Sequence, residues 1–497
     1  MVGVKIIGHD DVYECALIVD LFYDKTAYQV ITDSEVTEHF EHIIENEYIE
    51  IPTGMRLETR ILDDKGHVTY VSQREMTEQF EDVFERRAIL KRLNKVTLYE
   101  ALSSLMPSKS KWGTLVGIRP VKIVHEFLDK GESLDRVRAY LKELMVSEEK
   151  IDLVTDIALR ERPFVENEAM EGLSLYISIP FCPTRCHYCS FPSNDLTKKG
   201  KHIPEYLDHL LYEVEAIVDY LNTKGKYFDC VYIGGGTPSV LTAEQMDHLL
   251  KGLRDRIDFS KVIEFTFEAG RPDMVSYDKL EVLKAQGVTR ICLNPQTFND
   301  RTLVQVGRAH TADEFCEAFC KAKEFDFESV NFDLILGLAD ESLEEMKESI
   351  DRAILLEPEN ITVHTLAVKR ASQINEFNES HLIGEKNTVE EAIAYMYDEM
   401  AVAGYVPYYM YRQKNMVGNL ENVGFCKEGK EAVYNIRMME ERHTIVALGA
   451  GAVSKIVFPK ENRFERHASP KGLEVYLDNH KDYLEKHMIA LKSKFGD

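Results

Sequence analysis

Three cysteines stand close together and are the residues of this chain best suited to hold a metal group. Cys182, Cys186 and Cys189 follow the spacing C-x3-C-x2-C, so one tight loop can offer three thiolates to one face of a cluster. Thiolates select soft metals and iron-sulfur clusters. Three ligands would leave one iron of a cubane cluster without a protein ligand, and therefore open to react.

Zinc is the alternative metal for the same thiolates. A structural zinc site usually has a fourth Cys or His nearby, and His187 lies inside the loop and could serve. That interpretation leaves the rest of the pattern unexplained, so we expect an iron-sulfur cluster held by the three cysteines.

A glycine-rich segment follows the next apolar run along the chain. Gly234, Gly235 and Gly236 precede Thr237 and Pro238. Glycine lacks a Cβ, so its backbone can come close to a bound ligand. Three glycines alone more often make a turn than a site, but their place after a strand and behind the cysteine loop favours binding.

The elements that must position these motifs begin at Leu173, where short apolar strands alternate with amphipathic helices. We expect strands at 174–181, 228–236, 262–269, 290–297, 330–336 and 360–366, and helices including 204–222, 243–256 and 343–356. This alternation predicts a parallel sheet. Six such units make an open, partial (β/α)6 barrel, with functional groups at the carboxyl ends of its strands.

Three further polar residues fall at those strand ends. Glu268 ends the third expected strand, Gln296 ends the fourth, and Asp333 lies in the fifth. A single acid at a strand end is as readily a helix N-cap or a surface carboxylate. Together with the cysteine and glycine motifs, however, they indicate one site at the mouth of the barrel.

The segment LYISIPFCPTRCHYCSF, residues 175–191, resembles the signature of the radical S-adenosylmethionine (SAM) superfamily. GGGTP at 234–238 is similar to the form of that superfamily's glycine motif found in oxygen-independent coproporphyrinogen III oxidase-like proteins. The resemblance covers about Leu173 to Ala371, and the chain looks most like the HemZ-type branch. It implies a partial barrel with a four-iron four-sulfur cluster and SAM as cofactors.

The resemblance also implies roles for individual residues. It assigns the three cysteines to the cluster, and places Tyr188 on adenine, Glu268 at the ribose hydroxyls and Tyr176 beside the sulfonium, where a ring face attracts a cation. The other residues that match SAM-binding positions are Gly235, Gly236, Thr237, Gln296, Arg308, Asp333 and Ala367.

The activity that the resemblance implies is the oxidative decarboxylation of two propionates of coproporphyrinogen III to vinyl groups, which gives protoporphyrinogen IX. The substrate would be a tetrapyrrole, and the electron donor a protein such as flavodoxin or ferredoxin. Two departures from the oxidases keep alternatives open: Ser178 stands where they carry His, and Ser190-Phe191 where they carry Gly-Cys. The alternatives are a haem-binding chaperone and a radical SAM enzyme that acts on haem by methyl transfer or ring opening.

The sequence outside the barrel predicts two further domains. We expect a mixed α+β domain at 1–168, the barrel at 169–371 and a smaller α+β extension at 372–497 that covers the substrate. In the first domain, 12–24 alternates like a strand, Asp64 to Gly66 reads as a hairpin turn, and 78–94 reads as a helix. An acidic, Pro-containing linker is expected at about 161–171.

The irregular, Tyr- and Asn-rich stretch from Tyr408 to Cys426 is expected to form the substrate loop. A tetrapyrrole with four carboxylates needs cations, and we expect Arg412, Lys414 and Arg308 near them. Arg412 and Tyr176 are thus the candidate catalytic residues. The remaining cysteines are interpreted as structural, with Cys426 the one to watch because of its place in this stretch.

Composition excludes several classes of protein. The formal net charge of -25 repels phosphate backbones, so a dedicated nucleic-acid binder is not expected. No apolar stretch is long enough for a membrane span. Nine cysteines in 497 residues, three of them clustered, do not form a secreted disulfide pattern. The sequence therefore predicts a cytoplasmic protein.

Overall fold

The structure of the protein is a computed structural model. It describes residues 1–31, 40–78, 82–108, 110–117, 119–166, 171–367, 372–376, 383–412, 416, 420–461 and 463–497. The chain divides into two compact units, Met1–Thr155 and Asp156–Asp497. All the motifs of the expected site lie in the second unit.

The first unit is built on a five-stranded sheet of order β2-β1-β3-β4-β5. Its strands are β1 (Val2–Ile7), β2 (Tyr28–Ile31), β3 (His42–Ile51), β4 (Gly54–Leu62) and β5 (Val68–Met76). Helices α1 (Val12–Val19), α2 (Val83–Ser103), α3 (Pro120–Asp129) and α4 (Leu134–Glu143) belong to the same unit, and α5 (Glu148–Val165) contains the boundary.

One local prediction for the first unit was wrong. The expected strand at 12–24 is instead the helix α1, which buries Cys15, Ile18 and Val19. These buried residues are three and four positions apart, which places them on one face of a helix. Because the segment is apolar almost throughout, its sequence fits both this helical spacing and the alternation of a strand. The expected linker at 161–171 is helical as far as Val165, as part of α5.

The predicted hairpin is confirmed between β4 and β5. Asp63 accepts hydrogen bonds from the backbone N–H groups of Lys65 at 2.9 Å and His67 at 2.8 Å. Gly66 has a φ of +81°, a conformation that glycine adopts without steric cost. The expected helix at 78–94 corresponds to α2.

The six predicted strands of the barrel are confirmed as a parallel sheet in the second unit. They are β6 (Leu173–Ile179), β9 (Phe228–Gly235), β10 (Glu264–Gly270), β11 (Arg290–Leu293), β12 (Ser329–Leu336) and β13 (Asn360–Thr365). Short strands β7 (Phe181–Cys182) and β8 (Asn194–Asp195) pair beside the cysteine loop. The sheet does not close, as expected for a partial barrel.

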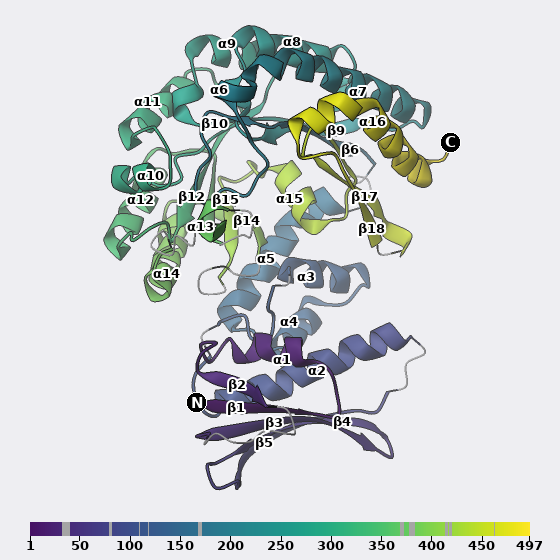
Figure 1. Cartoon of the computed structure of the whole chain (residues 1–497), viewed down its shortest axis with the longest axis vertical. Helices are drawn as coiled ribbons and strands as arrows, with labels where there is room; N and C mark the ends of the chain where they lie inside the picture. The colour runs from purple at the N-terminus through teal and green to yellow at the C-terminus, as the bar shows by residue number, and fades with distance from the viewer. Residues whose placement is uncertain are drawn as a thin grey trace. The chain divides into compact units, whose positions relative to one another are not determined.

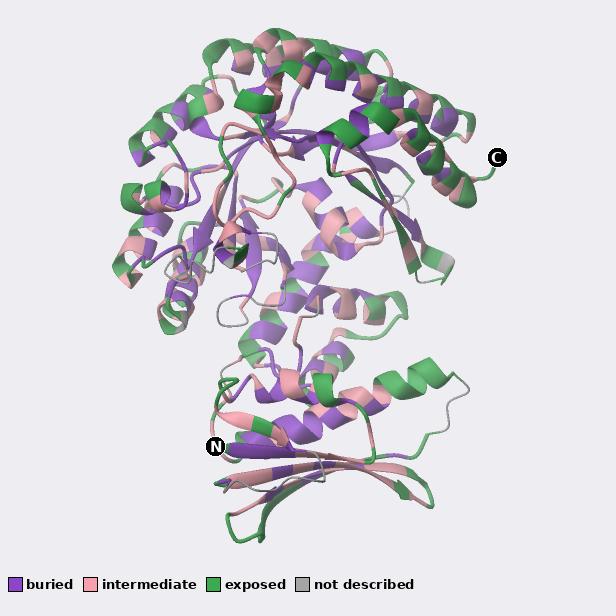
Figure 2. Ribbon diagram, in the orientation of Figure 1, coloured by how far each residue is buried: buried purple, intermediate pink, exposed green. Residues whose placement is uncertain are grey.

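Helices follow one another along the outer side of this curved sheet (Figure 1). They are α7 (Ile203–Thr223), α8 (Ala243–Arg254), α9 (Tyr277–Ala285), α10 (Asp300–Gln305), α11 (Ala312–Lys323) and α12 (Leu343–Leu355), and the short α6 (Leu196–Lys199) follows β8. Capping boxes at Thr242, Thr311 and Ser342 fix the starts of α8, α11 and α12. Figure 2 shows the strands largely buried and the outward faces of the helices exposed.

The residues after 371 extend the same sheet at both edges. On one edge β15 (Asn422–Cys426) pairs antiparallel with β13, and β14 (Val406–Tyr411) pairs with β15. On the other edge β16 (Ile445–Leu448) runs parallel to β6, followed by β17 (Val453–Phe458) and β18 (Arg463–Ala468). The remaining helices are α13 (Gln373–Glu376), α14 (Lys386–Val402), α15 (Val433–Glu440) and α16 (Leu473–Phe495). The division at 371 stays a prediction.

The stretch from Tyr408 to Cys426 was expected to be an irregular loop, and this prediction was wrong. Most of its described residues belong to the strands β14 and β15. Strand pairing with β13 supplies hydrogen-bond partners that the local sequence does not reveal. Cys426 is fully buried on β15, which supports its structural interpretation. Lys414 lies outside the described residues.

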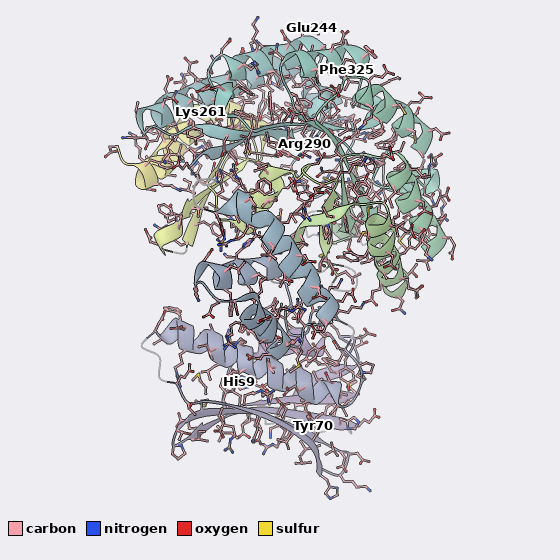
Figure 3. All side chains as sticks on the ribbon, turned by 180° about the vertical axis from the view of Figure 1, so that it is seen from behind. His9, Tyr70, Glu244, Lys261, Arg290 and Phe325 are labelled. Carbon is pink, nitrogen blue, oxygen red and sulfur yellow. The ribbon has the colours of Figure 1, made fainter. Side chains whose placement is uncertain are left out.

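Helix α15 packs against the interior of the parallel sheet through a buried polar network. Glu264 on β10 accepts hydrogen bonds from the backbone N–H groups of Val433 at 2.8 Å and Tyr434 at 3.0 Å, the first residues of α15. A carboxylate at a helix N-terminus satisfies donors that the helix leaves open. Arg290, labelled in Figure 3, lies 3.3 Å from Glu264 and also donates to Asn331. These bonds fix α15 beside the strands that carry the site.

Candidate functional site

A cavity of about 280 Å³ lies at the carboxyl ends of the parallel strands. Ligand sites are generally concave, and at this end of a barrel they are expected. The cavity is lined by Cys182, Thr184, Arg185, Cys186, Tyr188, Cys189, Ser190, Phe191, Ser193, Gly235, Gly236, Thr237, Glu268, Gly270, Arg271, Asn294, Gln296, Arg308, Asp333, Ile335, His364, Thr365, Leu366, Ala367, Tyr411 and Asn422.

The three cysteines of the loop after β6 all line this cavity and are partly exposed. The Cys189 backbone N–H donates to Cys186 O at 3.0 Å, which makes the turn that brings these two residues round. Burial raises the pKa of the Cys182 and Cys189 thiols. A positive metal group would offset this effect by binding them as thiolates.

The spacing of the sulfurs bears on the choice of metal. Within the described chain, the three Sγ atoms do not all lie within 4.8 Å of one another. Thiolates on a single tetrahedral zinc would be about 3.8 Å apart, because each Zn–S bond is about 2.3 Å long. A cluster that takes each thiolate on a different iron holds them farther apart, so the donor set fits an iron-sulfur cluster better than zinc.

The glycine segment lies directly against the cysteine loop. Gly236 N–H donates to Ile179 O at 2.9 Å, and Thr237 N–H donates to Phe181 O at 2.8 Å. A Cβ on Gly236 would lie 2.6 Å from Phe181 O and 3.0 Å from Cys182 Sγ. Glycine is therefore required at 236 by close approach, and the two motifs form one rigid corner of the cavity.

Glu268, at the end of β10, reaches the cavity between the glycine segment and β11. Its Oε1 accepts a hydrogen bond of 2.6 Å from the Tyr232 hydroxyl. Burial raises the pKa of Glu268 to about 7, and the Tyr232 hydrogen bond opposes that rise. A Cβ on Gly234 would lie 2.9 Å from Glu268 Oε1, so this glycine leaves the carboxylate its room.

The next two strands bring Gln296 and Asp333 together through their backbones. Gln296 has a φ of +73°, its N–H donates to Asp333 O at 3.1 Å, and its carbonyl accepts from Ile335 N–H at 2.8 Å. A left-handed conformation at a residue with a side chain is uncommon and typical of functional sites. The bridge to β12 holds Gln296 in it.

Arg308 links the cysteine loop to β11. Its guanidinium donates to the Tyr188 hydroxyl at 3.0 Å and to Asn294 O at 2.5 Å. Tyr188 packs against a cluster of Val306, Ile335, Leu338, Ala339, Leu366 and Ile374. The tyrosine thus presents an apolar pocket beside the cysteines, which suits a flat, partly apolar ring such as a nucleobase.

Comparison with known proteins agrees with this geometry. The model of the radical SAM superfamily matches residues 176–353. The HemZ protein of Bacillus subtilis, named oxygen-independent coproporphyrinogen-III oxidase-like, is 37% identical over 78% of this chain and 78% of its own length. The chain belongs to the oxygen-independent coproporphyrinogen-III oxidase-like family, within the radical SAM superfamily.

Two further relatives place this oxidase-like protein among its neighbours. It is 30% identical to the heme chaperone HemW of Haemophilus influenzae, over 65% of this chain and 80% of that protein. The solved structure of the coproporphyrinogen III oxidase HemN of Escherichia coli has the same fold, with a TM-score of 0.52 and 21% identity, over 65% of this chain and 72% of that one.

The cofactors of the oxidase-like protein are those of its superfamily, a four-iron four-sulfur cluster and SAM. The residues of the cavity fit them. The cysteine loop offers three separated sulfurs, the glycine segment lets a ligand approach its backbone closely, and Glu268 and Asp333 offer carboxylates. Which residue meets which part of SAM stays a prediction from the resemblance.

Of the predicted residues for the cluster and SAM, all but Tyr176 line the cavity, and Arg412, predicted for the substrate, does not. Tyr176 lies within the barrel, where its ring stacks on Tyr232 at 5.9 Å and Tyr434 at 6.3 Å between centroids. The Arg412 side chain is buried, with 4% of the residue exposed, and burial lowers its pKa to about 10. Its expected place beside a substrate carboxylate stays a prediction.

Sequence reasoning missed several residues of the cavity wall. Arg271 holds Asp273 through two hydrogen bonds of 3.0 Å and donates to Thr184 in the cysteine loop at 2.6 Å. Its position one residue after a strand end could have indicated it. His364, Tyr411 and Asn422 come from β13, β14 and the start of β15. The last two could not be found, because strand pairing alone brings them to the cavity.

Among the described residues, no helix is both long enough and apolar enough to cross a membrane.

Proposed function

We propose that this chain is an oxidoreductase of tetrapyrrole metabolism that decarboxylates two propionates of coproporphyrinogen III to vinyl groups without oxygen, giving protoporphyrinogen IX. The observation that carries the proposal is the corner at which the cysteine loop meets the glycine segment, with Glu268 on the same cavity. The similarity to HemZ, which is named after this oxidase, supports the substrate class.

The cluster and SAM, when bound, supply the electron transfer and the hydrogen abstraction of this chemistry. The chain's own residues would bind SAM and orient it. Backbone groups of Gly235 and Gly236 would hold the amino and carboxylate ends of SAM, Glu268 would accept its ribose hydroxyls, and Tyr188 would lie on its adenine. The apolar cluster behind Tyr188 would keep water from that end of the cavity.

Each reaction cycle needs an electron from outside the chain, because SAM cleavage is reductive. A flavodoxin or a ferredoxin is the expected donor. The reaction also releases an electron with the carbon dioxide, so an acceptor must take it up. The tetrapyrrole carboxylates would contact cations of the cavity and its rim, with Arg308 and Arg412 as the described candidates.

The second candidate function is the binding and transfer of haem, or the modification of haem. The similarity to the heme chaperone HemW favours it, since 65% of this chain matches that protein at 30% identity. Ser190 and Phe191, both on the cavity wall, follow the third cysteine where the oxidases carry Gly-Cys. A protein of this kind would keep the cluster and SAM sites but leave coproporphyrinogen unchanged.

Anaerobic incubation of the reconstituted, reduced protein with SAM distinguishes the two functions. Coproporphyrinogen III and haem are supplied in separate reactions, and 5'-deoxyadenosine and the pigment masses are measured. Loss of two carboxyl groups from coproporphyrinogen III, in step with 5'-deoxyadenosine release, is the expected result. Unchanged coproporphyrinogen together with tight haem binding would replace the first proposal by the second.

A further inference from the structure

The cavity wall formed by β12, β13 and β14 carries a polar group of three side chains. His364 on β13 lies between Tyr411 on β14 and Asp333 on β12. Its Nδ1 is 2.9 Å from the Tyr411 hydroxyl, and its Nε2 is 3.6 Å from Asp333 Oδ2. All three residues line the cavity.

Neighbouring hydrogen bonds hold His364 in place. The next residue, Thr365, donates its backbone N–H to Asn422 Oδ1 at 2.7 Å and its hydroxyl to Glu421 O at 3.1 Å. These bonds fasten the end of β13 to β15. The His364 side chain is nevertheless 24% exposed and that of Asp333 33%, so both retain surface that a ligand can reach.

The two neighbours set the direction of the His364 hydrogen bonds. Burial raises the pKa of Tyr411, so its hydroxyl keeps its proton and can donate to Nδ1. The Asp333 carboxylate attracts a proton on Nε2, which favours that tautomer of the ring. At 3.6 Å the Nε2 to Asp333 separation is too long for a hydrogen bond, so the Nε2–H remains available to another acceptor.

Two of the arginines on the cavity wall already donate several hydrogen bonds within the protein. Arg271 forms two hydrogen bonds with Asp273 and one with Thr184. Arg308 donates to the Tyr188 hydroxyl and to Asn294 O. Arg185 belongs to the cysteine loop itself. A ligand carboxylate beside β12 and β13 can take a hydrogen bond from that wall itself, and His364 offers a donor there.

We propose that His364 is a specificity-determining residue whose Nε2–H donates to a carboxylate of the tetrapyrrole substrate. This inference rests on the proposed function and locates its substrate subsite. The reacting β-carbon of a propionate is two bonds from the carboxyl carbon, so that carboxylate must bind within a few Å of the cofactor. Asp333, which matches a SAM-binding position, lies 3.6 Å from His364 Nε2 and so puts His364 next to the cofactor.

Binding of coproporphyrin III, the stable oxidised form of the substrate, tests the subsite apart from turnover. Fluorescence titration of the full chain with its cluster reconstituted compares wild type with His364→Gln, Tyr411→Phe and the control His248→Gln. His248 also lies near a carboxylate, 3.4 Å from Asp208, but on an exposed surface. Loss of a hydrogen bond to a charged group should weaken binding by His364→Gln about ten- to hundredfold.

The other arms give expected results of their own. Tyr411→Phe, which keeps the ring, should cause a smaller loss because His364 is no longer held. His248→Gln should bind like wild type, as should all variants with the tetramethyl ester of coproporphyrin III, which has no carboxylate. A circular dichroism spectrum like that of wild type shows that each variant is folded.

Three results would overturn the inference. The first is equal affinity of wild type and both cavity variants for coproporphyrin III. The second is a loss of affinity for the tetramethyl ester as large as the loss for coproporphyrin III. The third is a Soret band of bound haemin that changes with His364→Gln, which would make His364 an iron ligand. Different results would reject the His364 subsite and the proposed decarboxylation. Decarboxylation with unchanged binding by the variants rejects only the subsite, and His364-dependent binding without decarboxylation rejects only the reaction.

Discussion

The Tyr232 hydroxyl donates a hydrogen bond of 2.6 Å to Glu268, a carboxylate whose pKa burial raises to about 7. The two residues come from neighbouring strands, β9 and β10, and the Tyr232 ring also stacks on Tyr434 at 4.4 Å between centroids. The hydrogen bond stabilises the ionised carboxylate, which accepts ligand hydroxyls more strongly than the neutral acid. Tyr232 therefore prepares Glu268 for binding.

We predict that SAM affinity rises with pH as Glu268 ionises, with a midpoint near pH 7. In Tyr232→Phe the carboxylate loses the bond that lowers its pKa, so the midpoint should move to higher pH. Glu268→Gln should weaken binding by about ten- to hundredfold and remove this pH dependence. Calorimetric titration from pH 6 to 9 measures all three. The same midpoint in wild type and Glu268→Gln would assign the dependence to another group.

Replacement of Cys182, Cys186 and Cys189 together by Ala should abolish the iron and sulfide content of anaerobically reconstituted protein. About four irons per chain are expected in wild type, with absorbance near about 400 nm. The double variant Cys316→Ala/Cys320→Ala serves as the control, because these cysteines lie on α11 away from the cavity wall. Full iron content in the triple variant would contradict the assignment.

Gly236→Ala should reduce cluster content although it changes no ligand. The added Cβ would meet Phe181 O at 2.6 Å and Cys182 Sγ at 3.0 Å, so either the backbone or the sulfur must move. Gly472→Ala is the matched control, since its Cβ would meet only Val475, at 3.6 Å or more. Iron analysis after reconstitution measures the effect. Equal iron in the two variants would show that the corner tolerates the extra atom.

Stability should depend on pH through Glu213 on α7, which is buried and whose pKa burial raises from 4.5 to about 7. The unfolded chain ionises this group at lower pH than the folded chain does. The contribution of Glu213 to the free energy of unfolding should therefore be highest below pH 4.5, fall between about pH 4.5 and 7, and level off above. The decrease is on the order of 3 kcal/mol.

Urea unfolding at pH 5 and pH 8 tests this dependence. Glu213→Gln should be the more stable protein at pH 8, with a smaller difference between the two pH values than wild type. Glu244→Gln on the exposed start of α8 is the control, because hydrogen bonds at the start of that helix lower the pKa of Glu244. A decrease of the same size in wild type and Glu213→Gln would contradict the assignment.

Arg412→Ala should lower the free energy of unfolding by about 3 kcal/mol, since it removes a buried cation that interacts with buried Glu421. Tyr397 also donates to Glu421 at 2.9 Å and keeps this hydrogen bond in the variant. Urea unfolding compares this variant with Arg463→Ala at an exposed position. Unchanged stability with lost substrate conversion would instead support the predicted contact with a substrate carboxylate.

The sequence by itself determined the parts of the site that are local along the chain. The spacing of three cysteines requires one loop, the glycines require close backbone approach, and the alternation of strands and helices requires a parallel sheet. Glu268, Gln296 and Asp333 could be predicted because the carboxyl ends of parallel strands meet at one edge. The spacing of apolar residues did not distinguish helix from strand in the first unit, because residues 12–19 fit both patterns.

Only the tertiary structure decided which distant segments complete the cavity. Tyr411 lies 47 residues from His364 along the chain, and the pairing of β13 with β15 and of β15 with β14 brings them within 2.9 Å. The same pairing turned an expected loop into strands, because backbone hydrogen bonds to an existing sheet edge outweigh the weak local preference of a Tyr- and Asn-rich stretch. Which distant strands pair with one another cannot be predicted from the periodicity of the sequence, because that periodicity reflects only neighbouring residues.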